Sequence, residues 1–181
     1  MRINVVGTSG SGKSTFSKLL AKKMDLPYVE MDALHWKANW KESSDKELFN
    51  KLKNALSSKE WVLDGNYSKT EHIKWEKAQM VIFLDLPFYL VLYRIIKRSL
   101  VRGFKRQELW AGNKESILKV LFSKDSMILF TIKNFHENRK RYLKIFSKNQ
   151  NSQIKFVSLK SKKEMNNFIL TYNSEILYLK N

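Results

Sequence analysis

Short apolar runs alternate with longer amphipathic stretches along most of this chain. Apolar runs bounded by Gly, Pro or Asp predict buried strands. Five such runs lie at residues 3–6, 28–31, 61–63, 80–84 and 154–159. Between and after them, helical spacing predicts helices over 15–24, 44–56, 71–77, 87–102, 115–122, 126–146 and from 161 onward. This alternation predicts an α/β fold with a five-stranded parallel sheet covered on both faces.

The ends of several predicted helices carry recognisable signals. Ser44 to Glu47 and Ser161 to Glu164 both fit a capping box. Pro87 suits the first turn of the helix that it opens. Gly103 is expected to end that helix, leaving a basic, aromatic loop over 104–113. No repeat or linker interrupts the pattern, so residues 1–181 are expected to form one domain.

Polar residues follow the predicted strands at their carboxyl ends. They are Gly7 onward, Asp32, Asp64, Asp85 and Ser161. Parallel strands bring their carboxyl ends to one edge of the sheet, where such folds bind ligands. We therefore expect the functional site at that edge.

The segment after the first strand fits the phosphate-binding loop pattern G-x-x-x-x-G-K-[ST]. In this pattern glycines let backbone N–H groups turn toward phosphate oxygens, and the following helix N-terminus favours negative charge. Lys13 is expected to reach the β/γ-phosphates, and the Ser14 hydroxyl to bind Mg²⁺. The predicted ATP-binding residues are Gly7, Thr8, Ser9, Gly10, Ser11, Gly12, Lys13, Ser14 and Thr15.

Two aspartates compete as partners of the magnesium ion. Asp64 and Asp85 each follow an apolar strand, which is the form of the acidic group that holds the ion's water shell. In related folds the third strand lies beside the phosphate-loop strand, so Asp64 is favoured, acting through water. Either residue could instead cap a helix or turn.

Asp32 is the candidate general base. A carboxylate at the end of the second strand would face the phosphoryl acceptor and could take its proton during transfer. A plain turn residue is an equally good interpretation of Asp32.

Arginines form a row that differs from the scattered lysines. Arg94, Arg98, Arg102 and Arg106 follow at four-residue intervals, which places the first three on one helical face. Arginine binds phosphate in a bidentate way. Arg98, Arg102 and Arg106 are therefore predicted to stabilise the transferring phosphoryl group, in a lid region at about 98–114; a solvated basic face is the alternative.

Composition bears on the binding partners and the cellular compartment of the protein. A net charge of +17 favours polyanions, so nucleic acid is considered, but scattered lysine also fits a solvated surface. The chain has no cysteine and no apolar run of membrane-spanning length, and because the first strand begins directly after Met1 we expect no leader. We expect a cytoplasmic protein that binds ATP and a small molecule, without a membrane; the sequence does not indicate its oligomeric state. Without the signatures of GTPases, motors or transporter ATPases, a small kinase remains.

Four segments together carry a family resemblance: G-T-S-G-S-G-K-S-T, M-D-A-L-H-W, W-V-L-D-G-N-Y and F-L-D-L-P-F. They resemble the adenylate-kinase-related P-loop proteins often labelled FlaR-like or "DNA topology modulation" proteins, from Met1 to about Phe168. The resemblance implies a three-layer P-loop fold of the nucleoside-monophosphate-kinase type with a helical lid. It also implies that residues 7–15 bind ATP, that Arg98, Arg102 and Arg106 belong to the lid, and that the Ser161 region approaches the adenine.

One departure bears on the acceptor. D-G-N-Y stands where true adenylate kinases have D-G-F-P-R, so the arginine that reads the acceptor phosphate is missing there. Asp32 resembles the substrate-holding aspartate of shikimate-kinase-type enzymes. The sequence thus predicts an ATP- and Mg²⁺-dependent phosphotransferase acting on a hydroxyl or phosphate of a small acceptor. The alternative is a nucleic-acid-binding regulator that uses ATP binding as a switch.

Overall fold

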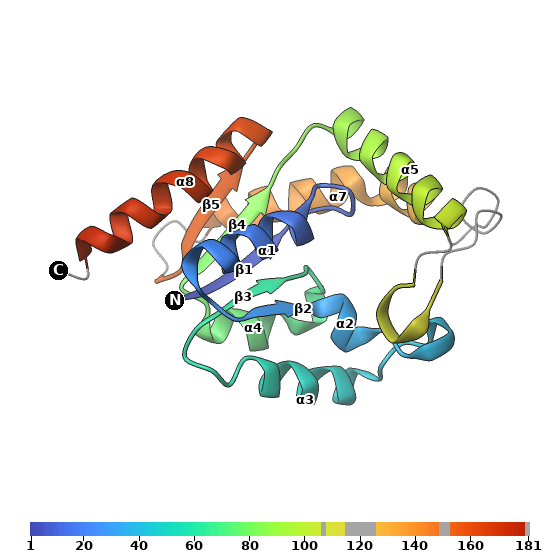
Figure 1. The fold of residues 1–181 in the computed structure, drawn as a ribbon, viewed down its shortest axis with the longest axis horizontal. Coiled ribbons are helices and arrows are strands. Elements are labelled where there is room, and N and C mark those ends of the chain that lie inside the picture. Colours follow the sequence, from blue (N-terminus) through green and yellow to red (C-terminus); the bar gives the residue numbers. More distant parts are fainter. Residues whose placement is uncertain (106–107, 115–125, 149–152, 180–181) are drawn as a thin grey trace.

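The computed structural model describes residues 1–105, 108–114, 126–148 and 153–179 of the chain. The predicted helix at 115–122 lies outside these residues, as does Arg106. Figure 1 shows the order of the elements along the chain. The strands are β1 (Arg2–Val6), β2 (Tyr28–Glu30), β3 (Trp61–Asp64), β4 (Met80–Leu84) and β5 (Lys155–Leu159). The helices are α1 (Lys13–Met24), α2 (Met31–His35), α3 (Asp45–Ala55), α4 (Glu71–Lys77), α5 (Phe88–Lys105), α7 (Met127–Lys148) and α8 (Lys162–Leu179), with short 3₁₀ turns η1 (Ala38–Trp40), η2 (Ser68–Thr70) and η3 (Trp110–Gly112).

The five strands form one parallel sheet in the order β2-β3-β1-β4-β5. Strand β1 lies at the centre and pairs with β3 on one side and β4 on the other. The five-stranded parallel α/β fold that the sequence predicts is therefore confirmed. The central position of β1 brings the loop that follows it between the carboxyl ends of β3 and β4.

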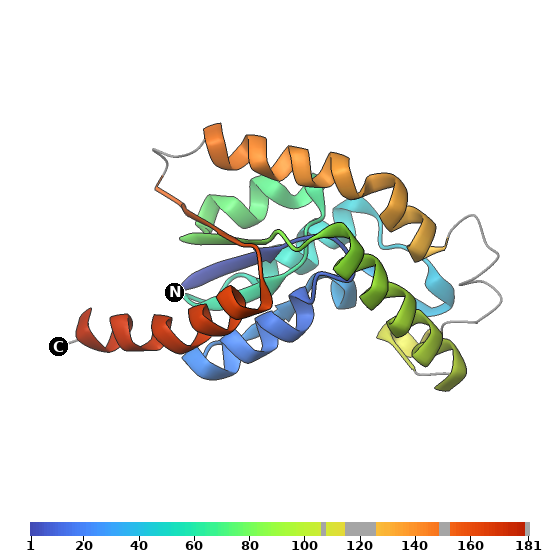
Figure 2. The same cartoon turned by 90° about the horizontal axis from the view of Figure 1, so that it is seen from above.

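Helices cover both faces of the sheet, as the edge-on view in Figure 2 shows. On one face Ile3, Val5 and Ile82 pack with Phe16 and Leu20 of α1 in a core that also includes residues of α8. On the other face alternate β1 and β4 residues pack near Tyr142 of α7. A third cluster joins α3 to β3 at the β2 side. Burial of the central strands on both faces explains their nearly continuous apolar sequence.

The capping box predicted at Ser44 is confirmed; at Ser161 one of its two bonds forms, and the Glu164 carboxylate accepts instead from the Lys160 N–H at 2.8 Å. The backbone N–H of Glu47 donates to Ser44 Oγ at 3.3 Å, and the Glu47 carboxylate accepts from the Ser44 N–H at 2.9 Å. At α8 the Glu164 N–H donates to Ser161 Oγ at 3.1 Å. These local signals depend on neighbouring residues alone, which is why the sequence indicates them well.

The prediction that the helix starting at Pro87 ends at Gly103 is wrong. Helix α5 continues through Gly103, which is buried, and ends at Lys105. A glycine within a helix costs roughly 0.5–1 kcal/mol relative to alanine. This cost weakens a helix without ending it, and before Gly103 α5 is already buried at Val91, Ile95 and Ser99.

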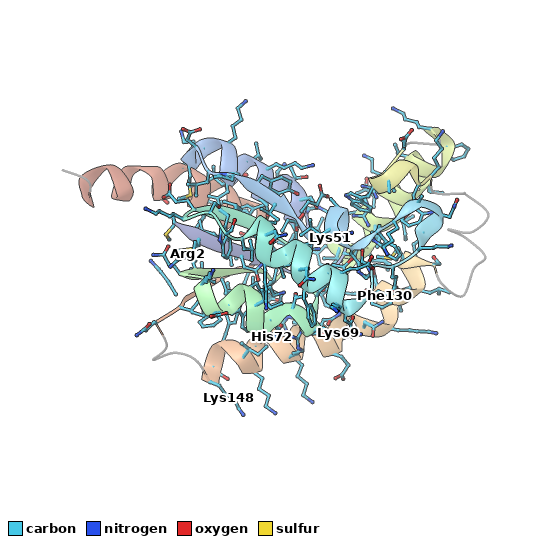
Figure 3. All side chains as sticks on the ribbon, turned by 90° about the horizontal axis from the view of Figure 1, so that it is seen from below. Arg2, Lys51, Lys69, His72, Phe130 and Lys148 are labelled. Atoms are coloured by element: carbon cyan, nitrogen blue, oxygen red, sulfur yellow. The ribbon has the colours of Figure 1, made fainter. Side chains whose placement is uncertain are left out.

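Basic side chains are spread over the surface that Figure 3 shows. Lys148 projects at one end of α7, whereas Lys69 lies by η2 beside Asp45 of α3, with a 3.0 Å ion pair. Within the described ranges, no helix is both long enough and apolar enough to cross a membrane.

Candidate functional site

The loop between β1 and α1 adopts backbone conformations that only glycine takes easily. Gly10 has φ +85° and Gly12 has φ +93°, in the left-handed region. A Cβ at Gly10 would come within 2.7 Å of the Val91 carbonyl oxygen of α5. The glycines of the motif thus allow both the tight turn and the close approach of α5.

Two arginines of α5 hold this loop from outside. Arg94 Nη1 donates to the Ser11 carbonyl oxygen at 3.1 Å, and Arg98 Nη2 donates to Ser9 Oγ at 2.9 Å. The row predicted from four-residue spacing therefore faces the phosphate loop over at least these two members. Arg94, Arg98 and Arg102 also line an open hollow of about 300 Å³ on this side of α5.

Asp64 is the last residue of β3, lies near Lys13 and Ser14 of the phosphate loop, and is buried. Burial raises the pKa of its carboxyl, whereas Lys13 and the Ser14 hydroxyl oppose that rise. Its Oδ2 accepts a hydrogen bond from Tyr28 at 3.2 Å, and its Oδ1 meets no hydrogen-bond partner among the described residues. A buried carboxylate oxygen left unpaired beside the Ser14 hydroxyl suits the water shell of a magnesium ion, so the residues present fit this ion.

Asp85 has a different environment. Its carboxylate receives two hydrogen bonds from Arg139 of α7, at 2.6 and 3.0 Å. Arg141, two residues further along α7, donates a hydrogen bond to Glu71 of α4. Of the two competing aspartates, Asp64 is the one placed beside Lys13 and Ser14, and Asp85 is bound to an arginine.

Asp32 lies in the first turn of α2, directly after β2. Its Oδ1 accepts a 2.8 Å hydrogen bond from the Tyr67 hydroxyl. The Tyr67 ring packs against the buried His35 ring, with centroids 4.7 Å apart. Burial and the nearby Asp32 raise the pKa of Tyr67, so its hydroxyl stays protonated and can donate.

Gly65 sets the distance between β3 and α2. Its φ is +144°, and a Cβ there would lie 2.4 Å from the Cβ and Cγ of Met31. Because Met31 is fully buried at the start of α2, Gly65 fixes how closely Asp32 approaches the sheet edge.

Comparisons with known proteins agree with this geometry. A family model described as "AAA domain" (AAA_18) matches residues 3–111, which include the phosphate loop, Asp32, Asp64, Arg94, Arg98 and Arg102. The chain belongs to this family. The fold of this AAA domain is that of the P-loop NTPases, as the phosphate loop and the sheet order together indicate.

Curated relatives match less than half of the chain. A bifunctional pantoate ligase/cytidylate kinase of Prochlorococcus marinus (strain AS9601) is 36% identical over 94 residues, covering 44% of this chain. The one from strain MIT 9301 is 34% identical over 94 residues, with the same coverage. The match spans only 18% of the length of these relatives.

Solved structures share the fold over nearly the whole chain. Shikimate kinase from Aquifex aeolicus has a TM-score of 0.53 at 20% identity and covers 98% of this chain and 99% of its own. A gluconokinase from Sinorhizobium meliloti has a TM-score of 0.53 at 16% identity, covering 99% and 97%. Deoxyadenosine kinase from M. mycoides has a TM-score of 0.54 at 15% identity, covering 96% and 100%. At these identities the likeness confirms the three-layer P-loop fold of the AAA domain.

One residue near the site was not singled out from the sequence. Lys74 of α4 is fully buried, and burial lowers its pKa to about 7. Its Nζ donates to the carbonyl oxygen of Tyr67 at 3.2 Å, so it supports the segment that contacts Asp32. The sequence signal was weak, because a single lysine within an amphipathic helix normally lies on the solvent side.

Proposed function

We propose that this protein transfers the γ-phosphoryl group of ATP to a hydroxyl group of a small molecule. The observation that carries the proposal is the position of Asp32. Its carboxylate accepts a hydrogen bond from Tyr67, and it lies at the carboxyl edge of the sheet, from which the phosphate loop also extends. An acceptor hydroxyl needs a base at this place, whereas an acceptor phosphate needs cations.

The donor half of the proposed site is the phosphate loop. Backbone N–H groups of residues 7–15 would surround the phosphates, and Lys13 would bind the β/γ-phosphates. Ser14 would ligate the magnesium ion, and Asp64 would hold its water shell. The ion neutralises phosphate charge when bound.

The acceptor half depends on Asp32. Its carboxylate would orient the acceptor hydroxyl and accept its proton while the oxygen bonds to the γ-phosphorus. The bond from that phosphorus to the β–γ bridging oxygen breaks at the same time, and ADP leaves. Arg98, Arg102 and Arg106 would stabilise the charge on the transferring group, Arg98 by leaving the Ser9 hydroxyl for a phosphate oxygen.

The names of the similar proteins support kinase chemistry in this chain. Each carries a kinase name, and shikimate, gluconate and deoxyadenosine are acceptors with hydroxyl groups. The cytidylate kinase name points instead to a phosphate acceptor. In this chain Ser68 occupies the fourth place after Asp64, where D-G-F-P-R has the arginine that reads an acceptor phosphate, so a hydroxyl acceptor is favoured.

A panel of acceptors tests the proposal. Purified protein with Mg-ATP is offered hydroxy acids, sugars, nucleosides and nucleoside monophosphates, and ADP formation is followed above the rate without acceptor. We expect turnover with a hydroxyl acceptor and a loss of at least a hundredfold in Lys13→Ala. Turnover with nucleoside monophosphates alone would overturn the hydroxyl assignment, and no turnover with any class would overturn the transferase.

The role of Asp32 needs its own variant. Asp32→Asn keeps the shape and can still accept from Tyr67, but it cannot take a proton. We expect kcat to fall by about a thousandfold, within the usual range for a general base, with little change in ATP affinity. Asp45→Asn, an exposed aspartate at the start of α3, is the matched control. A kcat within threefold of the wild type in Asp32→Asn would remove Asp32 as the base.

A further inference from the structure

Two short hairpins of similar form lie far apart in the sequence. Trp36 pairs with Glu42 around η1, and Glu108 pairs with Lys114 around η3, each in an antiparallel bridge. Both turns contain two successive residues with positive φ, Asn39–Trp40 and Ala111–Gly112. Three of these four residues are not glycine, so both turns adopt a conformation that must be stabilised by their surroundings.

The two hairpins contact one another through Asn113, whose side chain is buried. Its Oδ1 accepts from the backbone N–H of Trp40 at 2.8 Å, and its Nδ2 donates to the Lys37 carbonyl oxygen at 2.8 Å. The Trp40 indole N–H also donates to the Lys114 carbonyl oxygen at 3.3 Å. Asn113 thus uses both ends of its amide to bind the other hairpin, and Figure 1 shows η3 (yellow) beside the loop after α2 (blue).

Each hairpin continues an element of the proposed site. The first follows α2, which carries Asp32, and the second follows α5, which carries the arginines. Trp110 of the second hairpin acts on the Glu30 carboxyl, two residues before Asp32, where it opposes the rise in pKa that burial causes. In its middle turns α5 binds the phosphate loop through Arg94 and Arg98. The contacts therefore run from the phosphate loop along α5, through both hairpins, to α2.

We propose that this hairpin pair forms one wall of the acceptor site, and that Asn113 is the positioning residue that holds it. This rests on the proposed function, because it assigns the wall to the acceptor half of that site. The pair fixes the arginine-bearing helix relative to the Asp32-bearing helix. The phosphate loop lies at the far end of this run of contacts, and its bonds to Arg94 and Arg98 involve neither hairpin.

The pairing can be measured without an acceptor. The chain has no cysteine, so Ala38→Cys and Ala111→Cys, both at exposed positions, accept nitroxide labels selectively. We expect a single narrow distribution of distances between the labels in the otherwise unchanged protein with Mg-ADP. Asn113→Ala should broaden it, whereas Asn50→Ala, an exposed asparagine of α3, should not.

Kinetics test the link to the acceptor, using the substrate that the panel identifies. In unlabelled protein, Asn113→Ala should raise KM for the acceptor at least tenfold and leave KM for ATP within twofold. Asn113→Asp retains the acceptor oxygen for Trp40 but lacks the donor to Lys37, so it should show a smaller change in the same direction. A merely structural role would instead lower the thermal midpoint and affect both KM values.

The outcomes separate this inference from the proposed function. A label distribution unchanged by Asn113→Ala overturns the pairing, and a broadened one with an unchanged acceptor KM overturns its role at the site. If the panel finds no acceptor, the proposed function fails. The label distances then decide alone whether Asn113 holds the two hairpins together.

Discussion

Lys74→Met is expected to stabilise the protein at neutral pH more than at alkaline pH. Lys74 is fully buried in α4, where burial lowers its pKa from 10.5 to about 7. Glu71 attracts its charge, but Glu71 is also bound to Arg141, which repels it. The remaining polar partner of the ammonium group that the structure gives is the carbonyl oxygen of Tyr67.

The sign and size follow from this pKa. Because the folded protein binds the Lys74 proton less tightly, unfolding takes up a proton between pH 7 and 10.5, and stability rises with pH across that window. With about 1.4 kcal/mol per unit, the lysine costs about 4 kcal/mol at pH 7 and about 1 kcal/mol at pH 9.5. The substitution should therefore raise the free energy of unfolding by about 3 kcal/mol more at pH 7 than at pH 9.5. Loss of the hydrogen bond to Tyr67 lowers the free energy of unfolding by about 1 kcal/mol at both pH values.

Urea unfolding followed by tryptophan fluorescence measures this difference. Wild type and variant are compared at pH 7 and at pH 9.5, so that all other titrating groups cancel. Lys77→Met, an exposed lysine of the same helix, is the matched control and should show no such difference between the two pH values. An equal effect of Lys74→Met at both pH values would show that Lys74 keeps an ordinary pKa and would refute the reasoning.

Three further substitutions test the site and its support. Tyr67→Phe keeps the ring packing but removes the hydrogen bond to Asp32, so kcat should fall about tenfold, equivalent to about 1.4 kcal/mol, in the acceptor assay. Gly65→Ala should push Met31 and α2 away from β3, lowering thermal stability by roughly 2–3 kcal/mol and kcat by about tenfold. Asp85→Asn weakens its ion pair with α7 and should destabilise the fold by about 2 kcal/mol in urea unfolding, with kcat retained.

Each of these three predictions has a control variant or a result that would contradict it. Tyr89 is an exposed tyrosine of α5, and Tyr89→Phe should leave kcat unchanged. An equal fall of kcat in Tyr89→Phe would show that the effect of Tyr67→Phe does not come from the contact with Asp32. Wild-type stability in Gly65→Ala would mean that α2 moves without cost. A loss of Mg-ATP turnover with unchanged stability in Asp85→Asn would assign Asp85, and not Asp64, to the metal.

The sequence predicted the parts of this protein that depend on local patterns. The strands, the capped starts of α3 and α8 and the phosphate loop all follow from neighbouring residues. Gly103 was misinterpreted because a glycine signals only a weak preference, which a helix with a buried face overrides. Arg139 and Arg141 of α7 both bind carboxylates of other elements, which neighbouring residues alone do not indicate.

The remaining features depend on which segments meet in space. The choice between Asp64 and Asp85 could not be made from two similar strand ends, and the contact of Asp85 with α7 spans 54 positions. The pairing of the two hairpins spans more than 70 positions and depends on one asparagine amide. The bond from Tyr67 to Asp32 likewise joins separate elements. Periodicity cannot indicate such contacts, because it describes one element at a time.

The bonds from Arg94 and Arg98 to the phosphate loop have a consequence for nucleotide exchange. The protein itself supplies partners that keep the loop bent, so an arriving nucleotide need not meet the entropy cost of ordering it. A phosphate that takes Arg98 from the Ser9 hydroxyl replaces one hydrogen bond with another, and departure reverses the same exchange. Nucleotide affinity in such a loop depends on the quality of the new partners more than on folding of the loop. Rapid release of ADP after each transfer is then compatible with a loop that stays in shape throughout the cycle.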